Sequence, residues 1–330
     1  MRRATSRRDF LRISAGAVGA FSVPLFPAAV SSAAGAEPEK AAEPKLAFSA
    51  EGKEYRFDTG VLRGTLRPQG RSLGLAPAVD CQSGATLSGG FGLLSHYRLL
   101  DADARYGGGA WDWASTAQLL PDGAVEASWA ADQGHPFDMK AVYRWTAPGT
   151  LDVTTSVVPK KDLPRFEVFL ASYFVGFPAS FVYVKGCPET EGKPGLLEAK
   201  KSYAAWQMFP RDDEAVKTIG DGRWKRPPNP VDWKIMPVLG GALAVRRNAK
   251  AGLTALVMAP PEDCFAISTP YSEEGHGSLY FSLLGRDIKA GQAAAARARL
   301  VIGREIPDEK AIAAYEACLK ELRSSTPQGK

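Results

Sequence analysis

Alternation of apolar and polar residues is the feature that most limits how this chain can fold. Apolar side chains occupy every second position of one segment, at Phe137, Met139, Ala141, Tyr143 and Trp145. Residues 151–157 alternate in the same way, after an Ala-Pro-Gly turn at 147–149. Because side chains point to opposite faces of a strand in turn, this period predicts two strands that each bury one face. Their short separation predicts an antiparallel hairpin.

Short apolar runs separated by turn residues continue along most of the chain. They predict further strands at 55–67, 124–131, 165–174, 181–185, 234–246, 253–258, 264–268, 279–284 and 296–302. A clear helical pattern occurs only near the end, where Pro307 precedes Asp308 and Glu309 and apolar residues recur at Ile312, Tyr315, Leu319 and Leu322. About a dozen strands with so little helix exclude a doubly wound α/β fold. The pattern favours an all-β fold, a large antiparallel two-sheet β-sandwich with a C-terminal helix, as a single domain over 46–323.

The first residues carry an export pattern. Arg7 and Arg8 precede Asp9-Phe10-Leu11-Arg12, which matches the signal of the twin-arginine (Tat) pathway. A weakly apolar run follows, and Ala34-Gly35-Ala36 has the small-x-small spacing of a signal peptidase site. We therefore predict a signal peptide at 1–36, a polar linker at 37–45 and a disordered tail at 324–330. The mature protein is expected to be periplasmic or extracellular.

Removing that signal peptide changes the charge balance. The whole chain has 41 basic and 36 acidic residues, but residues 1–36 hold five arginines and one aspartate. The remainder is nearly neutral, which argues against a nucleic-acid partner, and its apolar runs are too short for a membrane span after cleavage. Its four cysteines, Cys81, Cys187, Cys264 and Cys318, form no metal-binding motif, and folding before export favours free buried thiols. We expect no cofactor and no metal, and the pattern leaves the oligomeric state open.

Residues 95–113 are the richest segment in groups that bind or transform a polar ligand. The side chains that we single out as substrate-binding are Arg105, Tyr106, Trp111, Asp112 and Trp113. Tryptophan faces pack on sugar rings, while arginine and aspartate bind hydroxyl or carboxylate groups, so the segment favours a carbohydrate ligand. The alternative is that the tryptophans belong to the core and the arginines pair with neighbouring aspartates.

Candidate catalytic residues fall in two places. On a strand, His96 and Arg98 would share one face, with Tyr97 on the other. The histidine would then transfer a proton and the arginine would hold a carboxylate; the alternative is a surface histidine beside a salt-bridged arginine. Later in the chain, Glu273 and His276 offer a general base, or else form a solvated hairpin tip. Trp206 and the segment 223–230 would form a groove wall, or else a solvated loop with a single packed tryptophan. No GxSxG, HExxH or P-loop motif occurs.

The strand plan resembles that of the galactose mutarotase-like superfamily, whose fold is a β-supersandwich. The local likeness lies in Leu283-Leu284-Gly285-Arg286-Asp287-Ile288-Lys289-Ala290-Gly291 and the final strand at 296–302. In the epimerases of that superfamily a histidine acts as acid and a late glutamate as base, an order that His96 and Glu273 follow. In its lyases an arginine or neutral polar group pairs with a uronate carboxylate while tyrosine or histidine removes a proton, side-chain types present at 96–98.

The resemblance and the residues together predict an exported carbohydrate-active protein that binds a glycan or sugar in a concave groove. A lyase, an epimerase or a hydrolase would fit the resemblance. A carbohydrate-binding module without turnover, or a scaffold that packs its aromatic segment against another protein, are the alternatives.

Overall fold

The computed structural model describes residues 46–67 and 74–324, with side chains as far as Leu322. The predicted signal peptide at 1–36 and linker at 37–45 lie outside the described residues, as do residues 325–330 of the predicted tail. All described residues belong to one compact unit.

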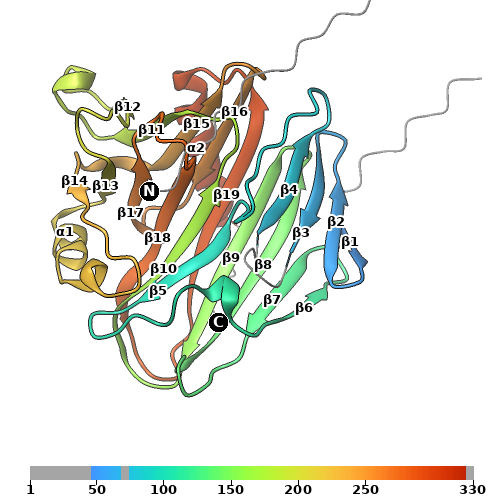
Figure 1. The fold of residues 1–330 in the computed structure, drawn as a ribbon, viewed down its shortest axis with the longest axis vertical. Coiled ribbons are helices and arrows are strands. Elements are labelled where there is room, and N and C mark those ends of the chain that lie inside the picture. The colour runs from blue at the N-terminus through green and yellow to red at the C-terminus, as the bar shows by residue number, and fades with distance from the viewer. Residues whose placement is uncertain (1–45, 68–73, 325–330) are drawn as a thin grey trace, which may run out of the picture. The chain divides into compact units, whose positions relative to one another are not determined.

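Three sheets make up the described part of the chain (Figure 1). The nine-stranded sheet has the order β12 (Gly195–Glu198), β11 (Ala179–Val184), β15 (Leu239–Asn248), β16 (Leu253–Met258), β19 (Ala294–Arg304), β9 (Thr150–Pro159), β8 (Phe137–Ala147), β7 (Val125–Trp129) and β6 (Thr116–Leu119). The six-stranded sheet has the order β14 (Lys234–Ile235), β13 (Trp206–Pro210), β17 (Cys264–Pro270), β18 (Ser278–Ile288), β10 (Leu163–Tyr173) and β5 (Ser95–Leu100). The four-stranded sheet runs in chain order through β1 (Phe48–Glu51), β2 (Glu54–Asp58), β3 (Leu62–Leu66) and β4 (Leu75–Asp80).

The core lies between the nine-stranded sheet and the two smaller sheets. Phe48 and Phe57 of the four-stranded sheet pack on Trp145 of β8, with ring centroids 6.0 and 4.8 Å from it. On the six-stranded sheet, inward side chains of β5 and β10 reach β8 and β9. Burying these apolar faces is the main source of stability for such a sandwich, at roughly 25 cal/mol per Å² of apolar surface. One face of the six-stranded sheet therefore points to the core, and its other face is available for a site.

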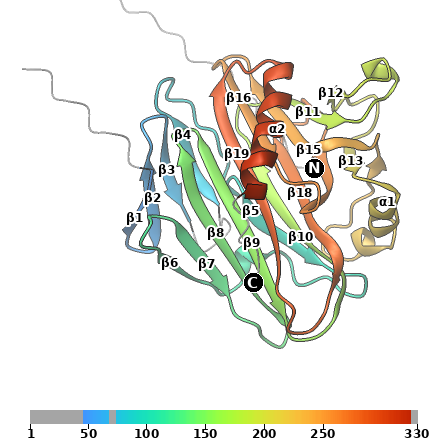
Figure 2. The ribbon, with the colours of Figure 1, turned by 180° about the vertical axis from the view of Figure 1, so that it is seen from behind.

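The C-terminal helix α2 (Asp308–Ser324) covers the outer face of the nine-stranded sheet (Figure 2). Tyr315 and Cys318 pack there with Leu243, Val245 and Leu256 of β15 and β16. The Tyr315 hydroxyl accepts a hydrogen bond from the backbone N–H of Ala242 at 3.0 Å. Among the described helices, none has both the length and the apolar character that crossing a membrane requires.

The predicted all-β sandwich with a terminal helix is confirmed, and so is the hairpin, since β8 and β9 pair along their whole length. Two details differ. The predicted strand at 55–67 is two strands, β2 and β3, because Thr59 turns the chain and accepts the Leu62 N–H on its side chain. A short helix, α1 (Asp213–Ile219), forms between β13 and β14, where the sequence pattern predicted none, and it is capped by Asp212, which accepts the N–H of Ala215. The four cysteines are free, as expected, and three are buried.

Candidate functional site

A cavity of about 390 Å³ opens on the outer face of the six-stranded sheet. Its floor comes from β5, β10 and β18, and its walls come from β13, the segment 221–233 and the turn 271–277. The lining residues are Tyr97, Arg98, Phe169, Tyr173, Trp206, Asn229, Pro230, Val231, Asp232, Trp233, His276 and Tyr280. Seven of these twelve carry an aromatic ring, counting the imidazole of His276. An aromatic cavity with few polar groups and a volume in the range of roughly 300–1,000 Å³ is typical of sites for small ligands.

A β-bulge brings two chemically useful residues of β5 to this face. Leu99 pairs with Val168 and His96 pairs with Leu170, so Tyr97 and Arg98 together oppose the single residue Phe169. Such an insertion breaks the strict alternation of side chains. Tyr97 and Arg98 both line the cavity as a result, whereas His96 points into the core. The predicted arrangement, with His96 and Arg98 on one face, is thereby corrected.

Arg98 is the unusual group of the cavity. It is only 5% exposed, yet no carboxylate in the described part of the chain forms an ion pair with it. Its Nη2 donates to the Tyr97 hydroxyl at 3.3 Å, while Nε and Nη1 have no hydrogen-bond partner among the described residues. The guanidinium lies 5.0 Å from the Tyr97 ring centroid and 5.4 Å from that of Trp224, which partly stabilises the charge. A buried donor without a partner still costs about 1–3 kcal/mol, and more when it is charged.

The tyrosines around Arg98 are held by stacking and by one another. Tyr97 stacks on Trp111 with ring centroids 4.1 Å apart and an interplanar angle of 11°. Tyr280 donates from its hydroxyl to that of Tyr173 at 3.4 Å. Burial raises the pKa of both Tyr173 and Tyr280, so the two phenols remain protonated at neutral pH. They are therefore available as hydrogen-bond partners for a polar ligand.

The wall formed by residues 221–233 is anchored through a buried ion pair. Arg223 donates to Glu167 of β10 at 2.9 Å, and both side chains are fully buried. Asp221 receives further hydrogen bonds from the same guanidinium, at 2.8 Å to Nη2. This anchor fixes Trp224 against Phe169 of the cavity floor, with ring centroids 4.8 Å apart. The groove wall predicted at 223–230 is thus adjacent to the cavity, and Asn229 and Pro230 line it.

The turn at 271–277 brings His276 to the rim. Its ring lies edge-on to Tyr173 and Trp206, with centroid distances of 5.3 and 6.2 Å. Gly277 follows with φ +63°, and a Cβ there would lie 2.0 Å from the carbonyl oxygen of Phe174. Only glycine therefore allows this close approach, which fixes the turn against the end of β10.

His96 lies in the core, away from the cavity. Its Nε2 is 2.8 Å from Oγ1 of Thr155, and its Nδ1 is 3.3 Å from the hydroxyl of Tyr143. The side chain is fully buried, and this desolvation lowers the pKa of His96 to about 3. A neutral histidine sealed between the sheets cannot exchange a proton with a ligand in the cavity, so we assign it no part in the site.

The other predicted residues divide into lining, supporting and remote positions. Trp206 lines the cavity, and Trp111 supports Tyr97 from behind. Arg105 links two loops, because it donates to the carbonyls of Gly107, Gly108, Arg226 and Pro228. The remaining four residues lie away from the cavity. Tyr106 donates to Asp101 in the core, and the Trp113 ring packs on His135. Asp112 and Glu273 are exposed.

Several lining residues escaped prediction. Phe169, Tyr173 and Tyr280 lie on strands where an aromatic side chain is as typical of a core as of a site. Trp233 follows a proline-rich segment, and no pattern in the sequence around it distinguishes a cavity residue from a loop residue. The alternation along β10 could have assigned Phe169 and Tyr173 to one face, but it could not show that this face holds a cavity.

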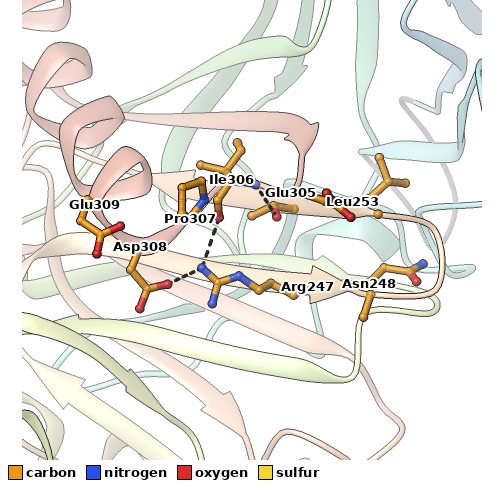
Figure 3. A pocket seen from close by; sticks show the side chains of 11 residues that line it. Arg247, Asn248, Leu253, Glu305, Ile306, Pro307, Asp308 and Glu309 are labelled. Atoms are coloured by element: carbon orange, nitrogen blue, oxygen red, sulfur yellow. Dashed lines mark hydrogen bonds and ion pairs between the residues drawn. The ribbon is translucent and has the colours of Figure 1, made fainter.

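A second cavity, of about 520 Å³, lies where β15, β16 and β19 meet the start of α2 (Figure 3). Its one arginine is already paired with a carboxylate. Arg247 forms an ion pair with Asp308 at 2.5 Å and also donates to the carbonyl of Ile306. No aromatic ring lines it. Although larger, it has no counterpart to Arg98, a buried guanidinium with unpartnered nitrogens. No cluster of three or more potential metal ligands occurs among residues 46–67 and 74–324.

No family model matches this sequence, and a search of curated proteins found no match. Solved structures do match its fold. A galactose mutarotase-like protein from Lactobacillus casei is 11% identical, with a TM-score of 0.51 over 76% of this chain and 100% of its own. An aldose epimerase homologue from C. elegans is 10% identical, with a TM-score of 0.46 over 79% of this chain and 99% of its own. A quadruple mutant of an α-N-acetylgalactosaminidase from Bifidobacterium bifidum is 10% identical, with a TM-score of 0.48 over 83% of this chain and 39% of its own.

The chain therefore has the galactose mutarotase-like fold, as its strand plan and closing turn predicted. At 11% identity the likeness to the Lactobacillus casei protein concerns the fold alone.

Proposed function

We propose that this is an exported sugar-binding protein whose ligand occupies the aromatic cavity on the six-stranded sheet. The single observation that carries the proposal is the composition of that cavity: six aromatic side chains and His276 surround a buried arginine, for which the described residues provide no counter-ion. Aromatic faces pack against the apolar faces of sugar rings, and Arg98 and the phenols bind oxygen atoms.

The fold supports the same proposal. The matching structure from Lactobacillus casei is described as galactose mutarotase-like, and galactose is a sugar. Export rests on the twin-arginine pattern at Arg7 and Arg8 and on the predicted cleavage before Glu37. Polymeric and soluble saccharides are ligands that a protein outside the inner membrane can reach.

The cavity favours binding over hydrolysis. Hydrolysis of a glycosidic bond ordinarily uses two carboxylates, one on each side of the bond. Asp232 is the only carboxylate that lines the cavity, and it is exposed and paired with Lys225. Proton transfer by His276 or a phenol is the remaining catalytic chemistry, as an epimerase or lyase would need. Binding is therefore the function that the geometry supports best, and turnover of this kind is the second candidate.

The test uses protein recovered from the periplasm, whose first residue is expected to be Glu37. Titration calorimetry against neutral and acidic mono- and oligosaccharides should then detect a ligand. Trp206→Ala should lower its affinity roughly tenfold, because a lining ring is lost. Trp113→Ala is the matched control, since Trp113 stacks on His135 outside the cavity, and it should leave the affinity unchanged. Absence of binding by every saccharide, or equal losses in the two variants, would contradict the proposal.

A further inference from the structure

We propose that the cavity selects an acidic saccharide and that Arg98 binds its carboxylate or sulfate group. This inference rests on the proposed function and names the class of ligand for the same site. Its basis is the state of the Arg98 side chain: 5% exposed, at the cavity surface, with Nε and Nη1 unpartnered among the described residues. A guanidinium presents two parallel N–H groups to a planar anion, which is the interaction that this side chain lacks.

Two more hydrogen-bond donors at or next to the cavity lack a partner among the described residues. Besides Arg98, the indole N–H groups of Trp224 and Trp233 are buried without a partner in the part of the chain that the structure describes. Trp233 lines the cavity and Trp224 lies against the guanidinium. A ligand that supplies several oxygen acceptors would satisfy such groups, whereas a cationic ligand would not.

A second cation adds to the positive potential. Arg105 lies near enough to Arg98 for the two guanidinium groups to repel each other, and burial together with this repulsion lowers the pKa of Arg105 to about 10. Arg105 is held by backbone carbonyls, which carry no full negative charge. The only lining carboxylate, Asp232, has an exposed side chain at the rim and forms its ion pair with Lys225. Nothing in the cavity lining therefore neutralises Arg98 from within.

The remaining lining suits the sugar ring to which the anion is attached. Tyr97, Phe169 and Tyr173 lie beside Arg98 on the floor, while Trp206 and Trp233 stand together in one wall with ring centroids 5.9 Å apart. The volume of about 390 Å³ is near the lower end of the range for ligand sites. We therefore expect one or two sugar units with a single acidic group directed at Arg98.

The experiment compares matched ligand pairs by titration calorimetry. The probes are methyl glucuronide against methyl glucoside, the corresponding galacto and manno pairs, and glucose 6-sulfate against glucose. The wild-type protein should prefer the acidic member of at least one pair roughly 10- to 100-fold, because a charge-assisted bidentate interaction is gained. Arg98→Gln should abolish that preference, because the affinity for the acidic member falls much further than the affinity for the neutral member. Arg98→Lys, which keeps the charge but not the planar fork, should be intermediate.

Two controls separate recognition from a structural role. Arg144→Gln removes an exposed arginine on the nine-stranded sheet, paired with Asp122, and should keep the full preference. Without ligand, Arg98→Gln should melt at the same temperature as the wild-type protein or higher, because a buried cation without a counter-ion has been removed.

Other results of the titrations would each refute one specific claim about the cavity. Equal affinity for the acidic and neutral members would refute acidic selection and leave the sugar site intact. A preference that survives in Arg98→Gln would refute the role of Arg98. Binding of inorganic sulfate as tightly as the sulfated sugar would reduce the site to an anion site and refute the saccharide class. Binding of no probe would refute this inference and the proposed function together.

Discussion

A buried histidine and a buried arginine, two residues apart on β5, lie in opposite environments. His96 is enclosed between the sheets with Thr155 and Tyr143, while Arg98 reaches the cavity on the other face. For His96 the surroundings favour the neutral ring. For Arg98, which is always charged, they leave hydrogen-bond donors unmet, and such a cost is typical of a binding site kept ready for a ligand.

The environment of His96 predicts how stability depends on pH. Its pKa is about 3 in the folded protein and near 6.5 when unfolded, so the unfolded state takes up the proton first as the pH falls. The contribution is therefore complete above about pH 6.5 and is lost as the pH falls toward 3. Between pH 7 and pH 5 the free energy of unfolding should fall by roughly 2 kcal/mol more in the wild-type protein than in His96→Gln. Urea unfolding at both pH values measures this, and identical pH dependence in the two proteins would contradict the buried neutral state.

At the scale of elements, the segment 221–233 determines one wall of the cavity. Its attachment depends on Arg223, which joins Glu167 of β10 to Asp221. Removing one partner of a buried ion pair is costly, since the other charge stays buried without compensation. The wall should therefore respond strongly to substitutions that lie outside the cavity itself.

Arg223→Met should lower the free energy of unfolding by about 3–5 kcal/mol, because Glu167 then loses its counter-ion. Adding Glu167→Gln should restore part of the loss. The single variant should also become sensitive to limited proteolysis within 221–233 and bind its ligand more weakly. Arg226→Met serves as the comparison, since the Arg226 side chain donates to the backbone carbonyls of Asp101 and Ala102 and forms no ion pair with a described residue. A loss below about 1 kcal/mol for Arg223→Met would show that the wall is held by other contacts.

The regularity of each strand determined how much of it could be predicted from the sequence. Alternation identified the β8–β9 hairpin and most strands, because an apolar face repeats over many residues. The bulge at Tyr97 and Arg98 could not be predicted from the sequence. One extra residue changes the face of the sheet to which the following side chains point, but it leaves the composition of the strand the same. Arg98 was therefore assigned to the ligand face correctly, but His96 was assigned there with it and Tyr97 to the opposite face. Trp206 and His276 were identified by residue type, whereas Tyr173 and Tyr280 resemble core residues until the sheets are assembled.

At the scale of the whole molecule, the sandwich separates a core face from a ligand face of the six-stranded sheet. The inner face meets the nine-stranded sheet, and α2 covers that sheet from the far side. The outer face of β5, β10 and β18 gathers residues from positions 97 to 280 into one cavity. This convergence of distant segments is a property of the fold, and no single stretch of sequence contains it.

The most direct test of the account is a crystal structure of the protein with bound methyl glucuronide or, if that sugar does not bind, with the tightest acidic saccharide of the panel. We predict the acidic group within about 2.7–3.2 Å of the Arg98 guanidinium nitrogens, with the sugar ring against the aromatic lining of the cavity. A ligand bound elsewhere, for example between Arg247 and the start of α2, would contradict the account. So would a ligand in the cavity whose acidic group points to solvent.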